Sequence, residues 1–161
     1  RSKVKIKFSV FENALFDAMD WDKVDGEIIH SQFLNPGNDG LDLSLCKVQV
    51  TDARFRGCGD KCISAGEGTH AQVQNSHFHD CNIGIAIKDS SHLSLANSLF
   101  SGCKIGYNSY RKKWRWEKGG EGIISHTRFL GSIEADVVGD KFSNISFQEI
   151  FRDQDNGSFS L

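Results

Sequence analysis

A repeat of about 22 residues is the feature that most restricts what this chain can fold into. Phe55, Phe78 and Phe100 lie 23 and 22 residues apart. A cysteine follows each phenylalanine by three residues, and a Gly-containing apolar run comes next. A fixed period in the twenties is typical of a solenoid, in which each repeat buries its apolar face against its neighbours.

The repeat extends beyond its best-preserved part, residues 38–113. Phe11 and Phe33 precede Phe55 in steps of 22, and Phe129 and Ile150 follow Phe100 in steps of 29 and 21. The residues seven and five positions before each marker alternate with polar residues, which is typical of strands. These pairs are Val4/Ile6, Gly26/Ile28, Val48/Val50, Ala71/Val73, Leu93/Leu95, Gly122/Ile124 and Ser143/Ile145.

Short apolar segments after the markers predict further strands at residues 41–43, 62–64, 85–87 and 105–107. Two or three short strands per turn, separated by Gly, Asn and Asp corners, predict a parallel β-helix. We therefore expect an all-β, single-stranded parallel β-helix of about seven turns over residues 1–161. Because the chain starts at Arg1 and its only methionine is Met19, we expect it to be part of a longer protein.

Two further columns follow the same period. Asp52, Asn75 and Asn97, with His30 and His126 in the outer turns, lie three residues before the marker, where such residues tolerate left-handed corners. Cys58, Cys81 and Cys103 lie three residues after it. For the cysteines we expect a stack of buried free thiols, with disulfides or a zinc site as the alternatives.

Composition excludes several classes of function. A net charge of −2 argues against a general nucleic-acid binder, and no apolar run is long enough to span a bilayer. The sequence contains no cofactor motif and no metal-ligand pattern. Its carboxylates are still compatible with binding of a cation such as calcium. The sequence also does not distinguish between a protein of the cell surface, a secreted protein and a cytoplasmic one.

The long step before Phe129 indicates an insertion at about residues 108–121. It carries Tyr110, Trp114 and Trp116 among five basic residues. Insertions in a solenoid form loops on one face, often the binding face, and aromatic rings beside cations suit sugar rings or nucleobases and anions. The alternative is a loop that folds back, with both tryptophans packing on the flank of the helix.

Two carboxylates, Asp39 and Asp60, lie 21 residues apart and so are expected on neighbouring turns of one face. Paired carboxylates are what glycoside hydrolysis requires, one as acid and one to activate water or attack. Residues 38–42 (NDGLD) and 59–63 (GDKCI) resemble the NTDGxD and GDDCI pattern of polygalacturonases, which are right-handed parallel β-helices. The resemblance implies that handedness here.

The same segment departs from that pattern in two places. Lys61 replaces the second Asp of GDD, and residues 82–84 (NIG) lack the histidine of the next motif. No counterpart of the later Arg-x-Lys motif is present. Only Asp39 and Asp60 of the hydrolytic acids would remain, so the resemblance implies kinship of fold more than shared activity.

A second resemblance covers about 75 residues. Residues 60–67 (DKCISAGE), 84–91 (GIAIKDSS) and 110–113 (YRKK) are similar to β-helix repeat modules of large bacterial proteins, some of which carry CotH-kinase-type domains. This resemblance implies an accessory module in a multidomain protein. We expect its partners to be a polysaccharide or the neighbouring domains. It brings no established catalytic residues.

The charged residues of these segments allow two interpretations. Either they form a structural ladder of ion pairs between turns, or they bind an anionic or neutral glycan. The candidates for ligand binding are Asp42, Glu67, Lys88, Asp89, Tyr110, Lys113, Trp114 and Trp116.

For function, we expect a non-catalytic scaffold or spacer that binds polysaccharide. The alternative is a polysaccharide hydrolase or lyase that uses Asp39, Asp60 and Lys61. In a lyase, Lys61 or Lys88 would act as the base.

Overall fold

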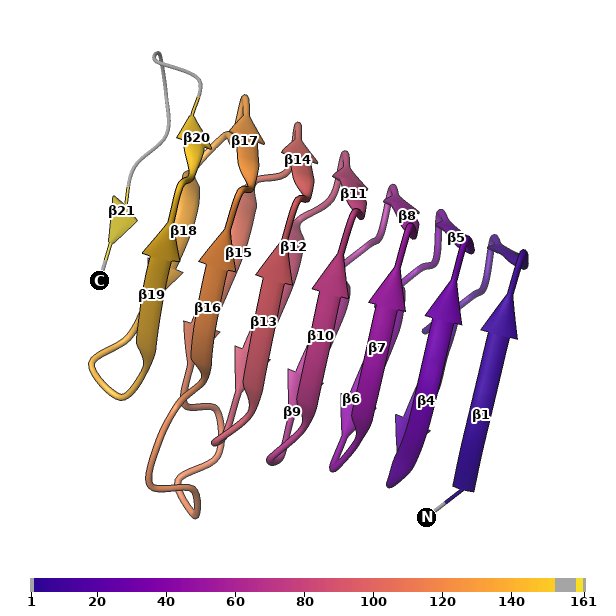
Figure 1. The fold of residues 1–161 in the computed structure, drawn as a ribbon, viewed down its shortest axis with the longest axis horizontal. Helices are drawn as coiled ribbons and strands as arrows, with labels where there is room; N and C mark the ends of the chain where they lie inside the picture. The colour runs from indigo at the N-terminus through magenta and orange to yellow at the C-terminus, as the bar shows by residue number, and fades with distance from the viewer. Residues whose placement is uncertain (1, 153–158, 161) are drawn as a thin grey trace.

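The computed structural model of the 161-residue chain describes residues 2–152 and 159–160, where all regular elements are β-strands. They form three sheets of seven parallel strands each (Figure 1). Sheet A contains β1 (Ser2–Lys7), β4 (Val24–Ile29), β7 (Lys47–Thr51), β10 (His70–Gln74), β13 (His92–Ala96), β16 (Glu121–Ser125) and β19 (Asn144–Gln148). Sheet B contains β2 (Val10–Glu12), β5 (Gln32–Leu34), β8 (Arg54–Arg56), β11 (His77–His79), β14 (Leu99–Ser101), β17 (Arg128–Leu130) and β20 (Phe151–Arg152). Sheet C contains β3 (Asp20–Asp22), β6 (Leu41–Ser44), β9 (Lys61–Gly66), β12 (Ile83–Lys88), β15 (Ile105–Tyr110), β18 (Ala135–Gly139) and β21 (Phe159–Ser160).

Each turn contributes one strand to each sheet, so the chain forms a parallel β-solenoid of seven turns. Successive turns are in register; Phe55 pairs with Phe78 in sheet B, and Val50 pairs with Val73 in sheet A. The predicted all-β class, parallel pairing and number of turns are confirmed. Across the described residues, no helix has the length and apolar character needed to cross a membrane.

The phenylalanine markers form a continuous stack inside the solenoid. The rings of Phe33, Phe55 and Phe78 follow one another at centroid distances of 4.7 and 5.2 Å, nearly parallel, and are buried. Phe11 lies at one end of the stack, and Phe129 lies at the other. Aromatic contacts of this kind each contribute roughly 0.5–1.5 kcal/mol beyond the burial of area.

The corner between sheets A and B requires the left-handed backbone that the sequence pattern predicted. His30, Asp52, Asn75, Asn97 and His126 all have positive φ, between 47° and 53°. The backbone amide of Asp52 donates to Gln74 O at 3.1 Å on the next turn, so hydrogen bonding between turns continues through the corner. The prediction for this column is confirmed.

The last turn corrects the predicted register. Arg152, and not Ile150, is the register partner of Phe129, although Ile150 packs against the core. In sheet A, Ile145 and Phe147 continue the columns of Gly122 and Ile124, so the predicted pair Ser143/Ile145 was placed two residues too early. The physical reason is that the connection to the last turn is longer than the period assumed.

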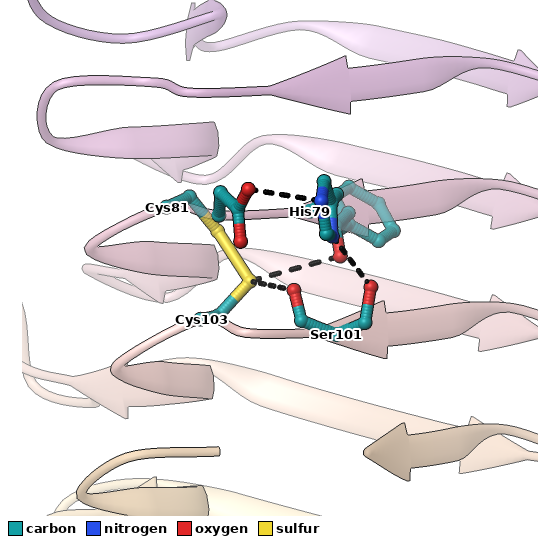
Figure 2. Close-up of a disulfide and its surroundings, with 6 residues drawn as sticks. His79, Cys81, Ser101 and Cys103 are labelled. Carbon is teal, nitrogen blue, oxygen red and sulfur yellow. Dashed lines mark hydrogen bonds and ion pairs between the residues drawn. A yellow bond between two sulfur atoms is a disulfide. The ribbon is translucent and has the colours of Figure 1, made fainter. Parts of the chain in front are cut away.

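The cysteine column also differs from the prediction in part. Cys58, Cys81 and Cys103 are buried as expected, but Cys81 and Cys103 form a disulfide between neighbouring turns (Figure 2). Their Cα atoms are 4.6 Å apart, because register stacking brings equivalent corner positions within disulfide reach. Cys46, Cys58 and Cys62 are free and buried.

A candidate binding face on sheet C

The polar side chains predicted to carry function gather around the outer surface of sheet C. Strands β6, β9, β12 and β15 lie side by side in this sheet. We call the group on and beside them the sheet C face. It consists of Asp39, Asp42, Asp60, Lys61, Ser64, Lys88 and Tyr110.

Lys61 joins the two carboxylates that the polygalacturonase resemblance singled out. Its ammonium lies 3.5 Å from Asp39 Oδ1 and forms an ion pair with Asp60. Its backbone amide also donates to Asp39 Oδ1, at 3.0 Å. Asp39 is buried, whereas Asp60 is partly exposed. The two acids therefore lie on neighbouring turns as predicted, with a lysine bound to both.

The electrostatics of this trio follow from burial. Burial raises the pKa of the Asp39 carboxyl, although the Lys61 charge and its backbone hydrogen bond oppose the effect. Burial on its own lowers the pKa of Lys61, but the hydrogen bond to Asp60 and the charges of Asp39 and Asp60 outweigh it, so that pKa is raised. Lys61 is thus held in its charged form mainly by the more exposed Asp60.

Lys88 occupies the next turn and behaves differently. Its ammonium donates a 2.7 Å hydrogen bond to Ser64 Oγ, and among the described residues no carboxylate forms an ion pair with it. Burial lowers the pKa of Lys88, and the charge of Asp42 opposes this only in part. Tyr110 is the register partner of Lys88, and burial raises the pKa of the Tyr110 phenol.

The insertion between β15 and β16 is held at the corner that leads from sheet C to sheet A. Glu67 forms ion pairs with Lys113 and, at 3.7 Å, with Arg115. The buried Asp89 carboxylate accepts hydrogen bonds of 2.8 Å from the backbone amides of Lys112 and Lys113. These contacts fix the first part of the loop against the two preceding turns.

The two tryptophans of the insertion have different environments. The Trp114 side chain is 90% exposed. The Trp116 ring lies close to Gly68 on the flank of the solenoid, and its buried Nε1 has no hydrogen-bond partner among the described residues. The two predicted roles are therefore divided between them, since Trp116 packs and Trp114 remains available to solvent.

The sequence-predicted residues thus fall into two groups. Asp39, Asp42, Asp60, Lys61, Lys88 and Tyr110 meet on the sheet C face, whereas Glu67, Asp89 and Lys113 hold the loop at the corner. Ser64 was missed, because a single serine in a strand carries no signal. Alternation along β9 would have placed it outward, between Asp42 and Ala86.

Asp20 was also missed as a neighbour of this face. It is the register partner of Asp42, and burial together with the charges of Asp42, Asp17 and Asp22 raises its pKa. No group of three or more His, Cys, Asp or Glu side chains within the described ranges is arranged to hold a metal ion.

Comparison with known proteins agrees with this architecture. The family model described as "Right handed beta helix region" matches residues 2–148. The crystal structure of alginate lyase from Paenibacillus sp. str. FPU-7 is similar, with a TM-score of 0.60 and 12% identity, over 98% of this chain and 72% of that chain. No curated protein matches the chain. The resemblance to modules of large bacterial proteins stays a prediction, whereas the predicted handedness is confirmed. The chain belongs to the family of right-handed β-helix proteins.

Proposed function

We propose that this β-helix is a polysaccharide-binding module that acts as a scaffold and binds its ligand along the sheet C face. The observation that carries the proposal is the adjacency of Lys61, Lys88 and Tyr110 on three successive turns. The loop that follows Tyr110 presents Trp114, which is 90% exposed. The ammonium of Lys88, which forms no ion pair among the described residues, suits a glycan carboxylate, and the exposed Trp114 ring suits the face of a sugar ring.

The contacts of the two acids favour binding over hydrolysis. Hydrolysis requires one carboxyl group to donate a proton and another to attack or activate water. Asp39 accepts hydrogen bonds from the backbone and side chain of Lys61, and Asp60 is paired with the same ammonium. Neither acid is free to exchange a proton with a substrate without breaking these contacts.

Affinity electrophoresis in gels containing alginate or polygalacturonate tests the proposal. We expect wild-type protein to be retarded and Trp114→Ala to lose about tenfold in affinity, the loss of one stacking contact. Arg54→Met removes an exposed cation of sheet B, away from this face, and serves as the control. Retardation that is unchanged by both Trp114→Ala and Lys88→Met would remove the sheet C face as the binding site.

A second candidate function is a polysaccharide lyase, which one specific observation favours. A lyase needs a base of lowered pKa and a proton donor for the leaving oxygen. Burial lowers the pKa of Lys88, and Tyr110 is its register partner on the next strand. The similar solved structure is described as an alginate lyase, which supports testing alginate first.

The two candidates give different results with the same substrate. A lyase produces an unsaturated sugar that absorbs ultraviolet light, and Lys88→Met and Tyr110→Phe should each abolish its formation. Arg54→Met, which changes an exposed residue of sheet B, should retain activity. Binding without any unsaturated product supports the scaffold, whereas product that persists in both variants contradicts the assignment of Lys88 and Tyr110.

The proposal also covers the parent protein and its cellular compartment. The similarity of residues 60–67, 84–91 and 110–113 to modules of large bacterial proteins supports a role in presenting neighbouring domains along a rigid rod. The Cys81–Cys103 disulfide supports an oxidising compartment, because such bonds are rare in the cytosol of most organisms. Expression of the complete gene product, followed by cell fractionation, tests both points.

A further inference from the structure

A groove lies over the outer face of sheet A, away from the sheet C face. Its volume is about 930 Å³, and residues of every strand of sheet A from β1 to β19 line it. Figure 1 shows the order of these strands. The size of the groove is within the range of ligand-binding clefts. Because the strands are in register, equivalent side chains recur along the groove at every turn, at steps of roughly 4.8 Å.

The charges that line this groove compensate one another. Lys5 and Glu27 form an ion pair at 2.6 Å near the N-terminal end. Glu121, near the other end, is 3.1 Å from His92 Nδ1 and 2.8 Å from Lys118. Three lysines face three acidic residues among the lining residues, so the groove carries no net charge that would attract an acidic polymer.

The middle of the groove offers uncharged hydrogen-bonding groups. Gln49, Gln72 and Ser94 are register partners on β7, β10 and β13, and all three are exposed. No intramolecular hydrogen bond uses their side chains within the described part of the chain. Beside them, the rings of His70 and His92 stack with centroids 4.7 Å apart, which gives the groove a flat face in one wall.

A second hollow, of about 450 Å³, opens from the same place. His92 and Glu121 line both hollows, and the second is completed by the insertion, including Arg115 and Trp116. The two hollows therefore adjoin at His92 and Glu121, and Trp116 of the loop lines the second.

We propose that the sheet A groove binds an uncharged polysaccharide chain that lies across the strands. The amide and hydroxyl groups of successive turns would bind successive hydroxyl-bearing units, because both partners repeat along the same axis. A peptide adding to a strand edge is a poorer fit, since β7, β10 and β13 are paired on both sides. This site is separate from the sheet C face and does not depend on the function proposed there.

Isothermal titration with hydroxyethylcellulose and mixed-linkage β-glucan tests the proposal, with alginate as the acidic comparison. Wild-type protein should bind at least one neutral polymer. Gln49→Ala/Gln72→Ala should weaken that binding about tenfold, the loss of two hydrogen bonds. Ser94→Arg should abolish it by filling and charging the middle of the groove.

Three controls keep the outcome specific. Gln32→Ala removes a glutamine from sheet B and should leave binding unchanged. Trp114→Ala and Lys88→Met, which test the sheet C face, should also leave the binding of neutral polymers unchanged. Circular dichroism should show that all variants retain the β-helix. Failure of wild-type protein to bind either neutral polymer, or full binding by Ser94→Arg, would overturn the proposal.

Discussion

The ammonium of Lys88 donates a 2.7 Å hydrogen bond to the hydroxyl of Ser64, its neighbour on the preceding turn of the solenoid. Both side chains are buried on the outer side of sheet C. Burial disfavours the charged ammonium, and the charge of Asp42 offsets this only partly, so the pKa of Lys88 is lowered. A cation is thus kept in a place that destabilises it, which is more typical of a functional residue than of a structural one.

The first prediction concerns the pH dependence of stability. Burial holds the folded pKa of Lys88 below its ordinary value of 10.5. Between those two values the unfolded chain binds more protons than the folded one, so the contribution of Lys88 becomes more favourable as pH rises. The free energy of unfolding of the wild type, relative to Lys88→Met, should therefore increase from neutral toward alkaline pH.

Urea denaturation of both proteins over that pH range provides the measurement. Arg54→Met, which removes an exposed cation of sheet B, should show no comparable trend. A difference between wild type and Lys88→Met that stays constant with pH would contradict a lowered pKa.

Much of the fold could be predicted from the sequence, because a solenoid repeats the same burial requirement in every turn. One column holds the rings of Phe33, Phe55, Phe78 and Phe100, because a spacing of one turn places each ring on the next. The final turn was misplaced because Arg152 replaces the aromatic marker, so the nearby Ile150 was taken in its place, two residues too early.

The candidate site was predicted less completely, because its contacts join residues of different turns. The sequence placed Asp39 and Asp60 together, but the role of Lys61 as the partner of both depends on its side chain turning back toward Asp39. Asp89 is a ligand-binding candidate by sequence, yet its carboxylate accepts hydrogen bonds from loop amides. Whether a given charge binds a ligand or a backbone amide depends on loop geometry that no local pattern records.

The second prediction compares the two acids that bind Lys61. Asp39→Ala leaves the buried backbone amide of Lys61 without its acceptor and the Lys61 ammonium with Asp60 alone, and should lower the free energy of unfolding by about 2 kcal/mol. The Asp60 side chain is 46% exposed, so Asp60→Ala should cost only about 1 kcal/mol. Urea denaturation at neutral pH measures both, and equal losses would contradict the assigned difference in burial.

The third prediction concerns a buried hydroxyl in the core. Tyr107 is fully buried, and among the described residues its hydroxyl has no hydrogen-bond partner. Tyr107→Phe should therefore keep or raise the stability, by up to about 1 kcal/mol. Gly122→Ala should cost about 1–3 kcal/mol, because a methyl group there would overlap the Tyr107 hydroxyl.

The double variant Tyr107→Phe/Gly122→Ala tests the same contact. Removing the hydroxyl makes room for the methyl group, so the double variant should recover most of the loss, with a coupling energy of roughly 1 kcal/mol or more. Thermal denaturation of the four proteins completes the cycle. Strict additivity would show that the Gly122→Ala penalty has another origin.

The fourth prediction concerns the Cys81–Cys103 disulfide, which closes a loop with a sequence separation of 22 residues. A closed loop of that length restricts the unfolded chain, and its loss should lower the free energy of unfolding by about 3 kcal/mol. Cys103→Ala should show this loss, and dithiothreitol should reduce the stability of the wild type but not that of the variant. Cys46→Ala changes a free buried thiol and should remain sensitive to dithiothreitol. If the wild type has the same stability with and without dithiothreitol under conditions where thiol titration proves reduction, the disulfide does not stabilise the solenoid.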